Sequence, residues 1–76
     1  MTLNLGFLLM LEGVVKWYNM KKGYGFIQSE GAEKDIFIHV TTLQKSGLKK
    51  LLEGQVVTFD VYNDNGKPAA ENILLK

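Results

Sequence analysis

The alternation of apolar and polar residues along the chain predicts a small all-β protein. Short runs rich in β-branched and aromatic residues are separated by segments rich in glycine, asparagine and lysine, which is typical of strands joined by turns. No run combines the length and the periodicity of an amphipathic helix. The predicted strands are residues 13–19, 23–29, 35–40, 55–62 and 69–74.

The connections between these strands favour a closed sheet. Residues 30–33 form a polar segment with one glycine, which suits a hairpin loop. The pair Asn65-Gly66 within residues 63–67 supplies the positive φ angles that a tight hairpin turn requires. Residues 41–54 predict a longer loop with one helical turn at 41–44. Five short strands with a single long connection indicate a small barrel, which also removes exposed strand edges.

Length and composition limit what such a barrel can do. With 76 residues there is room for one domain, and the absence of cysteine excludes disulfides, thiolate chemistry and zinc-finger ligand sets. The single histidine, His39, cannot form a histidine-rich metal site and has no evident catalytic triad. We therefore expect no enzymatic activity, no cofactor and no bound metal.

The charges are nearly balanced, with a net charge of +1, so electrostatic arguments depend on where the lysines stand. All nine cations are lysine, which disfavours sequence-specific reading of duplex DNA because bidentate guanidinium groups usually read guanine. Lys16, Lys21 and Lys22 stand beside aromatic residues. The remaining lysines suit an ordinary solvated surface.

Residues 1–10 form an apolar N-terminal extension that we expect to be flexible. The run from Phe7 to Leu11 is too short to span a bilayer, and no lysine or arginine precedes it, so we expect neither a signal peptide nor a membrane anchor. Met10 is an alternative start of the protein. We expect a cytoplasmic monomer that does not bind membranes.

Two neighbouring strands carry a predicted aromatic face. Tyr24 and Phe26 are two residues apart, so both rings point to one side of their strand. Phe37 and His39 are related in the same way on the next strand. Their opposite side is an aliphatic stripe that suits the core better, because valine and isoleucine pack well in a sheet interior. The stripe consists of Ile36, Ile38 and Val40.

If these two strands pair as a hairpin, the four rings lie together on the solvent side. An exposed aromatic cluster usually marks a binding surface, and stacking on such rings is worth about 1–3 kcal/mol per base whatever the base. The pattern therefore predicts binding of single-stranded nucleic acid. The reverse arrangement, with the rings inside the barrel, is an alternative, although Gly23 and Gly25 weakly favour the first arrangement.

Three segments together closely resemble the bacterial cold-shock proteins. They are Gly13–Asn19 (GVVKWYN), Lys22–Ile27 (KGYGFI) and Asp35–His39 (DIFIH). The resemblance extends from about Leu11 to Leu74, so a cold-shock domain is expected at residues 11–76. It implies a five-stranded antiparallel OB-fold-like β-barrel that binds single-stranded RNA and DNA with low sequence specificity. It also implies an RNA chaperone with roles in cold adaptation, transcription antitermination and translation.

The resemblance also assigns a set of binding residues. They are Lys16, Trp17, Tyr18, Lys22, Tyr24, Phe26, Asp35, Phe37 and His39. Trp17 conflicts with simple alternation, which places it with Val15 and opposite Lys16 and Tyr18. A bulge in the first strand would remove this conflict.

The sequence departs from the family pattern at three positions. Val40 and Leu48 stand where the family commonly has aromatic residues, and Lys67 precedes Pro68 where a glycine is usual. Because stacking platforms are lost, we expect fewer or weaker base contacts than in a member with the full aromatic set.

Three other readings are weaker. An OB-like protein-interaction module would dock its aromatic face on a protein partner. An RNA-recognition motif requires two helices that this chain lacks. An enzyme would need paired carboxylates, yet the available ones fall mostly in predicted loops, where such groups are usually solvated. These carboxylates belong to Glu30, Glu33, Asp35 and Glu53.

Overall fold

A computed structural model describes residues 11–76 of the chain. The N-terminal extension at residues 1–10 lies outside the described residues. The elements are β1 (Leu11–Asn19), β2 (Tyr24–Gln28), β3 (Ile36–His39), α2 (Val40–Lys45), β4 (Val56–Asp64) and β5 (Lys67–Leu75). Within the described part of the chain, no helix is long and apolar enough to cross a membrane.

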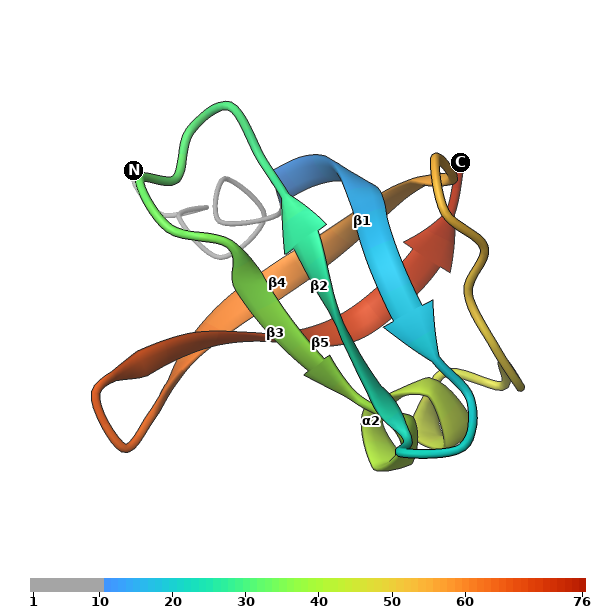
Figure 1. Cartoon of the computed structure of the whole chain (residues 1–76). Coiled ribbons are helices and arrows are strands. Elements are labelled where there is room, and N and C mark those ends of the chain that lie inside the picture. The colour runs from blue at the N-terminus through green and yellow to red at the C-terminus, as the bar shows by residue number, and fades with distance from the viewer. Residues whose placement is uncertain (1–10) are drawn as a thin grey trace, which may run out of the picture.

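The strands close into a barrel in the order β1-β2-β3-β5-β4, with β4 returning to pair with β1 (Figure 1). This confirms the predicted five-stranded, OB-fold-like β-barrel. The pairing is antiparallel throughout except between β3 and β5, which run parallel at Phe37 and Ala69. This parallel pair is possible because α2, the following loop and β4 lie between the two strands in sequence, which gives the long crossover that parallel strands need.

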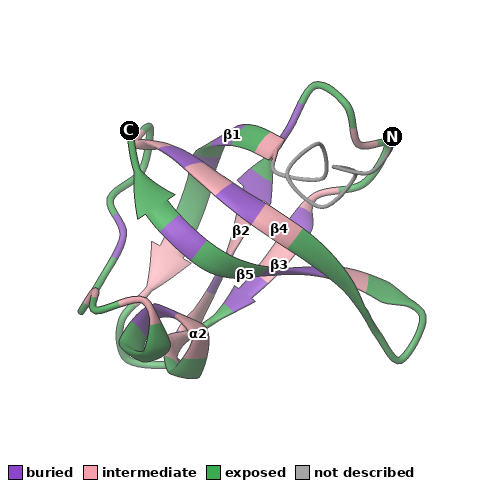
Figure 2. Cartoon of the chain, turned by 180° about the vertical axis from the view of Figure 1, so that it is seen from behind, coloured by how far each residue is buried: buried purple, intermediate pink, exposed green. Residues whose placement is uncertain are grey.

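The barrel is filled by the aliphatic positions that alternation predicts. Figure 2 shows buried segments alternating with intermediate or exposed ones along the strands. The most deeply buried large side chains come from all five strands and from α2, each with at most 1% of its surface exposed, and are Val15, Ile27, Ile36, Ile38, Leu43, Val57, Phe59 and Ile73. Burial of each such side chain contributes about 1.5–3 kcal/mol to folding. Among these fully buried side chains, Phe59 is the one aromatic residue and the rest are aliphatic.

The third strand is shorter than predicted, because a helix begins at its end. His39 has extended backbone angles and caps α2, its Nδ1 accepting a hydrogen bond from the Thr41 backbone N–H at 3.2 Å. Val40 is consequently the first residue of α2 and is only partly buried, contrary to its predicted place in the core stripe. The helical turn predicted at 41–44 lies within this helix.

The hairpin of β4 and β5 extends further than predicted. Asn65 and Gly66 both have positive φ, 55° and 87°, so the predicted tight turn is confirmed. Asp64 and Lys67 pair directly across it. Because this end of the hairpin projects beyond the barrel, Val61 is exposed and does not join Val57 and Phe59 in the core.

Candidate nucleic-acid interface

A β-bulge in β1 sets which side chains face outward. Val15 pairs with Ile27, but Trp17 rather than Lys16 pairs with Phe26, so Lys16 is one extra residue in β1. The bulge suggested by the sequence is therefore present. It shifts the alternation by one position and brings Trp17 to the face of β2 that carries the predicted rings.

Five rings from β1, β2 and β3 form one contiguous group, which we call the ring cluster: Trp17, Tyr24, Phe26, Phe37 and His39. The Trp17 ring lies 5.3 Å from Phe26 and 5.5 Å from Tyr24 between ring centres. Phe37 lies 5.7 Å from Phe26, 5.8 Å from Tyr24 and 6.3 Å from His39. These are ordinary spacings for packed aromatic pairs, so the rings support one another.

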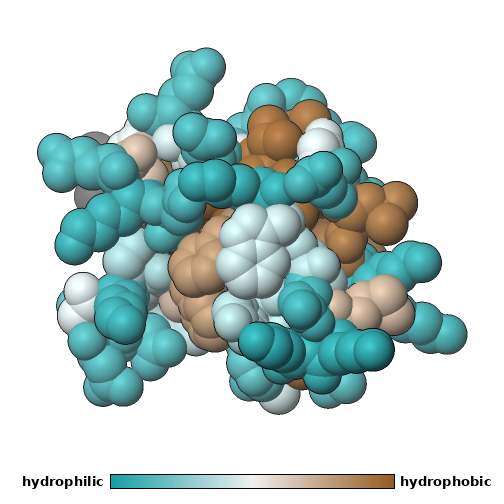
Figure 3. All heavy atoms as spheres, viewed as in Figure 1, coloured by the Kyte–Doolittle hydropathy of each residue, from teal (hydrophilic) through white to brown (hydrophobic). Residues whose placement is uncertain are grey.

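The ring cluster is open to solvent. Trp17 has 37% of its surface exposed, and Tyr24, Phe26 and Phe37 are half-buried. Figure 3 shows pale and light-brown rings at the centre of the face formed by β1, β2 and β3, with hydrophilic side chains around them. The alternative with the rings inside the barrel is thus wrong, because aliphatic residues already occupy the interior.

Close contact between β1 and β2 requires a glycine beneath the rings. A Cβ at Gly25 would collide with the carbonyl oxygen of Trp17 and with the ring of Tyr18. The glycine between Tyr24 and Phe26 therefore allows β1 to approach β2 closely. This contact places Trp17 against both rings of β2.

Tyr18 is the predicted site residue that the structure separates from the others. It pairs with Gly25, on the inner face, and packs against the hydrophobic core. Burial accordingly raises the pKa of the Tyr18 phenol above its usual value. Simple alternation placed Tyr18 outward with Lys16. This was wrong, because the bulge reverses the alternation after Lys16.

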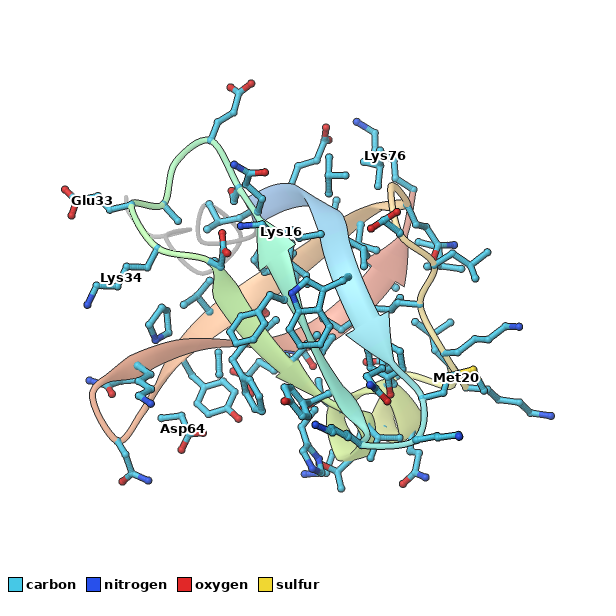
Figure 4. The ribbon with its side chains drawn as sticks, in the orientation of Figure 1. Lys16, Met20, Glu33, Lys34, Asp64 and Lys76 are labelled. Atoms are coloured by element: carbon cyan, nitrogen blue, oxygen red, sulfur yellow. The ribbon has the colours of Figure 1, made fainter. Side chains whose placement is uncertain are left out.

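The polar members of the predicted site are Lys16, Lys22, Asp35 and His39, and His39 also belongs to the ring cluster. The Lys16 Nζ lies 2.9 Å from an Asp35 carboxylate oxygen in an exposed ion pair, and Figure 4 shows Lys16 beside the rings. Lys22 lies in the turn before β2, where its backbone N–H donates to the Asn19 side chain at 2.9 Å. The His39 ring is held by its capping bond and lies 3.0 Å from the Thr41 hydroxyl. Lys16 on β1 thus stands beside the cluster, whereas Lys22 lies in the turn that contacts the start of α2, where the His39 ring is also fixed.

A groove of about 520 Å³ adjoins Phe26 and Phe37. The loop before β3 and the β4–β5 hairpin form the rest of its wall, with Lys34 and Asp64 on the left in Figure 4. The other lining residues are Asp35, Asn65, Lys67, Pro68 and Ala69. Sequence reasoning missed this groove, because residues between 26 and 37 form one side and residues between 64 and 69 form the other, and no local pattern links such distant segments. Asn65-Gly66 predicted the turn of this hairpin but not its projection beyond the barrel.

Within residues 11–76, no group of three histidine or acidic side chains is arranged to hold a metal ion. The chemistry available at this surface is instead that of exposed aromatic faces with nearby lysines. Flat faces of this kind stack on unpaired bases, and lysines contact phosphates.

Comparison with known proteins agrees with this geometry. The model of the 'Cold-shock' DNA-binding domain family matches residues 11–76. The cold shock-like protein CspB of Bacillus cereus is 48% identical, with 83% of this chain and 95% of that protein covered. The cold shock-like protein CspE of Escherichia coli is 44% identical, with 84% and 93% covered. The cold shock protein CspA of Rhizobium meliloti is 42% identical, with 84% and 96% covered. The chain therefore belongs to the cold-shock domain family of nucleic-acid-binding proteins.

Proposed function

We propose that this protein binds single-stranded RNA and DNA on the ring cluster, with low sequence specificity. The observation that carries the proposal is the cluster itself: five half-exposed rings from three adjacent strands, outside a barrel that is already filled. Exposure of these rings to water contributes nothing to stability, whereas each base stacked on them contributes about 1–3 kcal/mol to binding. Every base has a π face, so stacking discriminates little between sequences.

This binding mode supports an RNA chaperone. Bases held against the rings cannot pair with a complementary strand, so a weak RNA hairpin opens as its single-stranded form is bound. The energy comes from binding, and no nucleotide hydrolysis is needed. Roles in cold adaptation, transcription antitermination and translation follow from the same action, because each depends on keeping RNA unpaired. In this proposal the protein acts as a cytoplasmic monomer.

Electrostatics plays a smaller part than stacking in this proposal. The net charge is only +1, and Lys16 is already paired with Asp35 in the free protein. Lys22 is exposed in the turn just before β2 and has no ion-pair partner in the described part of the chain, so we expect it to contact phosphate more readily. Since each phosphate contact adds to the salt dependence of binding, we expect a shallow dependence of affinity on salt concentration.

The second candidate is a protein-interaction module that uses the same rings. The exposed, partly apolar character of the cluster favours it as well. A competition experiment separates the two candidates, because oligo-U would not displace a protein partner from a surface that binds only proteins.

The test is a titration of Trp17 fluorescence with oligo-dT and oligo-U. We compare the wild type with a Tyr24→Ala, Phe26→Ala, Phe37→Ala variant whose folding is verified by circular dichroism. Loss of at least two stacking platforms predicts a drop in affinity of 100-fold or more, on the order of 3 kcal/mol. Leu74→Ala, an exposed leucine on β5, is the matched control and should bind like the wild type. Unchanged affinity in the folded triple variant contradicts the proposal.

A further inference from the structure

One row of directly paired residues crosses every strand of the barrel. Trp17 pairs with Phe26, Phe26 with Phe37, Phe37 with Ala69, and Ala69 with Tyr62. Side chains of directly paired residues project from the same face of a sheet. The row therefore continues the outer face of the ring cluster through β5 to Tyr62 on β4.

Ala69 is the one small member of this row. It is 1% exposed, yet it does not belong to the core cluster, whereas its neighbour Ala70 does. Ala69 is thus covered from the outside, and it lines the groove together with Phe37. Phe37 and Tyr62 stand on either side of it, two strand spacings or about 10 Å apart. Tyr62 does not itself line the groove, but it pairs directly with Ala69, which does.

We propose that Tyr62 is an additional stacking platform for single-stranded nucleic acid, reached by a strand that leaves the ring cluster at Phe37 and crosses the groove. This inference rests on the proposed function and extends its binding path to the β4–β5 hairpin. Tyr62 is 40% exposed, slightly more than Trp17. In the described part of the chain no other aromatic ring packs against it, so its ring is available to a base.

The charges of the groove indicate how Tyr62 contributes. The groove is lined by two lysines and two aspartates, namely Lys34, Lys67, Asp35 and Asp64. Phosphate attraction and repulsion therefore offset each other there. The gain from crossing the groove comes from stacking on Tyr62, and this gain should not depend on salt.

The test is a length series of oligo-dT, titrated against the wild type, Tyr62→Ala and Tyr62→Phe. Oligonucleotides that are long enough to cross the groove should bind Tyr62→Ala at least about five-fold more weakly, as expected for one lost stacking contact. The shortest oligonucleotides that bind the ring cluster should show no difference. Tyr62→Phe keeps the ring and should bind like the wild type at every length. The slope of log affinity against log salt should be the same in all three proteins.

Val61→Ala is the matched control, since Val61 is the adjacent exposed residue and pairs with Ala70, which packs in the core. It should bind like the wild type at every length. A second measurement needs no variant: an oligo-dT with a terminal 5-iodouracil, tested at either end, should crosslink to Tyr62 of the wild type under ultraviolet light, as shown by mass spectrometry of the digested complex.

The outcomes separate this inference from the proposed function. Suppose that the triple ring variant loses binding. If Tyr62→Ala then matches the wild type at every length, or if no crosslink reaches Tyr62, the proposed platform at Tyr62 is wrong and the ring cluster alone binds. An equal loss at all lengths also overturns it, because that result indicates a general effect on the fold. If the wild type binds no oligonucleotide, both proposals fail.

Discussion

The two faces of the sheet formed by β1, β2 and β3 are built from alternating residues of the same strands, yet they differ in almost every property. The inner face is aliphatic and nearly inaccessible, as Ile27 and Ile38 show. The outer face is aromatic and partly exposed, as Phe26 and Phe37 show. The barrel requires the first face to be apolar, but nothing in its packing requires the second. The comparison separates residues kept for folding from residues available for binding.

The largest effect should follow from weakening the inner face. Ile38→Ala leaves a cavity in a small core and should lower the free energy of unfolding by about 2–5 kcal/mol. Urea denaturation followed by Trp17 fluorescence measures it. Phe37→Ala, the adjacent residue on the outer face, should cost clearly less stability while weakening oligonucleotide binding. Equal destabilisation by the two substitutions would show that the faces do not divide their roles in this way.

A smaller effect should follow from extending the outer face. Val40 begins α2 directly after His39 and is partly buried, with its side chain near Gly23. Val40→Phe adds a ring next to the cluster at a position where the family commonly has an aromatic residue. Affinity for oligo-dT should rise about five-fold, the value of one weak stacking contact. Leu48→Phe provides the companion measurement, and its gain should be smaller because Leu48 packs against the core. If neither variant gains affinity, the outer face does not lack stacking platforms at these two positions.

The smallest effect concerns the edge of the outer face. Lys16→Gln removes the exposed ion pair with Asp35 and should change stability by less than about 1 kcal/mol. If Lys16 exchanges Asp35 for a phosphate on binding, the slope of log affinity against log salt falls in magnitude by about 0.7. Titrations of oligo-dT at several salt concentrations provide the slope. An identical slope in the variant would show that Lys16 stays with Asp35 in the complex.

Much of the fold could be predicted because its signals are local. Alternation located all five strands, and Asn65-Gly66 located the hairpin turn. The ends of elements were less predictable. Val40 looks like the last position of an apolar stripe, and only the His39 cap and its bond to Thr41 show that the helix has already begun.

The site was predictable where one hairpin supplies it and unpredictable where distant strands meet. Tyr24, Phe26, Phe37 and His39 could be placed together because β2 and β3 are adjacent in sequence. Trp17 and Tyr18 could not be assigned to faces by counting, since the extra residue at Lys16 shifts the register. The pairing of β3 with β5, and with it the row that ends at Tyr62, is set by barrel closure and leaves no local pattern.

The row from Trp17 to Tyr62 exists only once every strand has found its partner. An unfolded chain, or one with an unpaired β5, scatters these residues along its length and offers no continuous stacking surface. A ligand that spans the row would therefore bind the native state and not the unfolded one. At a hundred-fold excess over Kd, such a ligand adds about 2.7 kcal/mol to the free energy of unfolding. This domain has no disulfide, so bound nucleic acid would be a reversible source of added stability for the closed barrel.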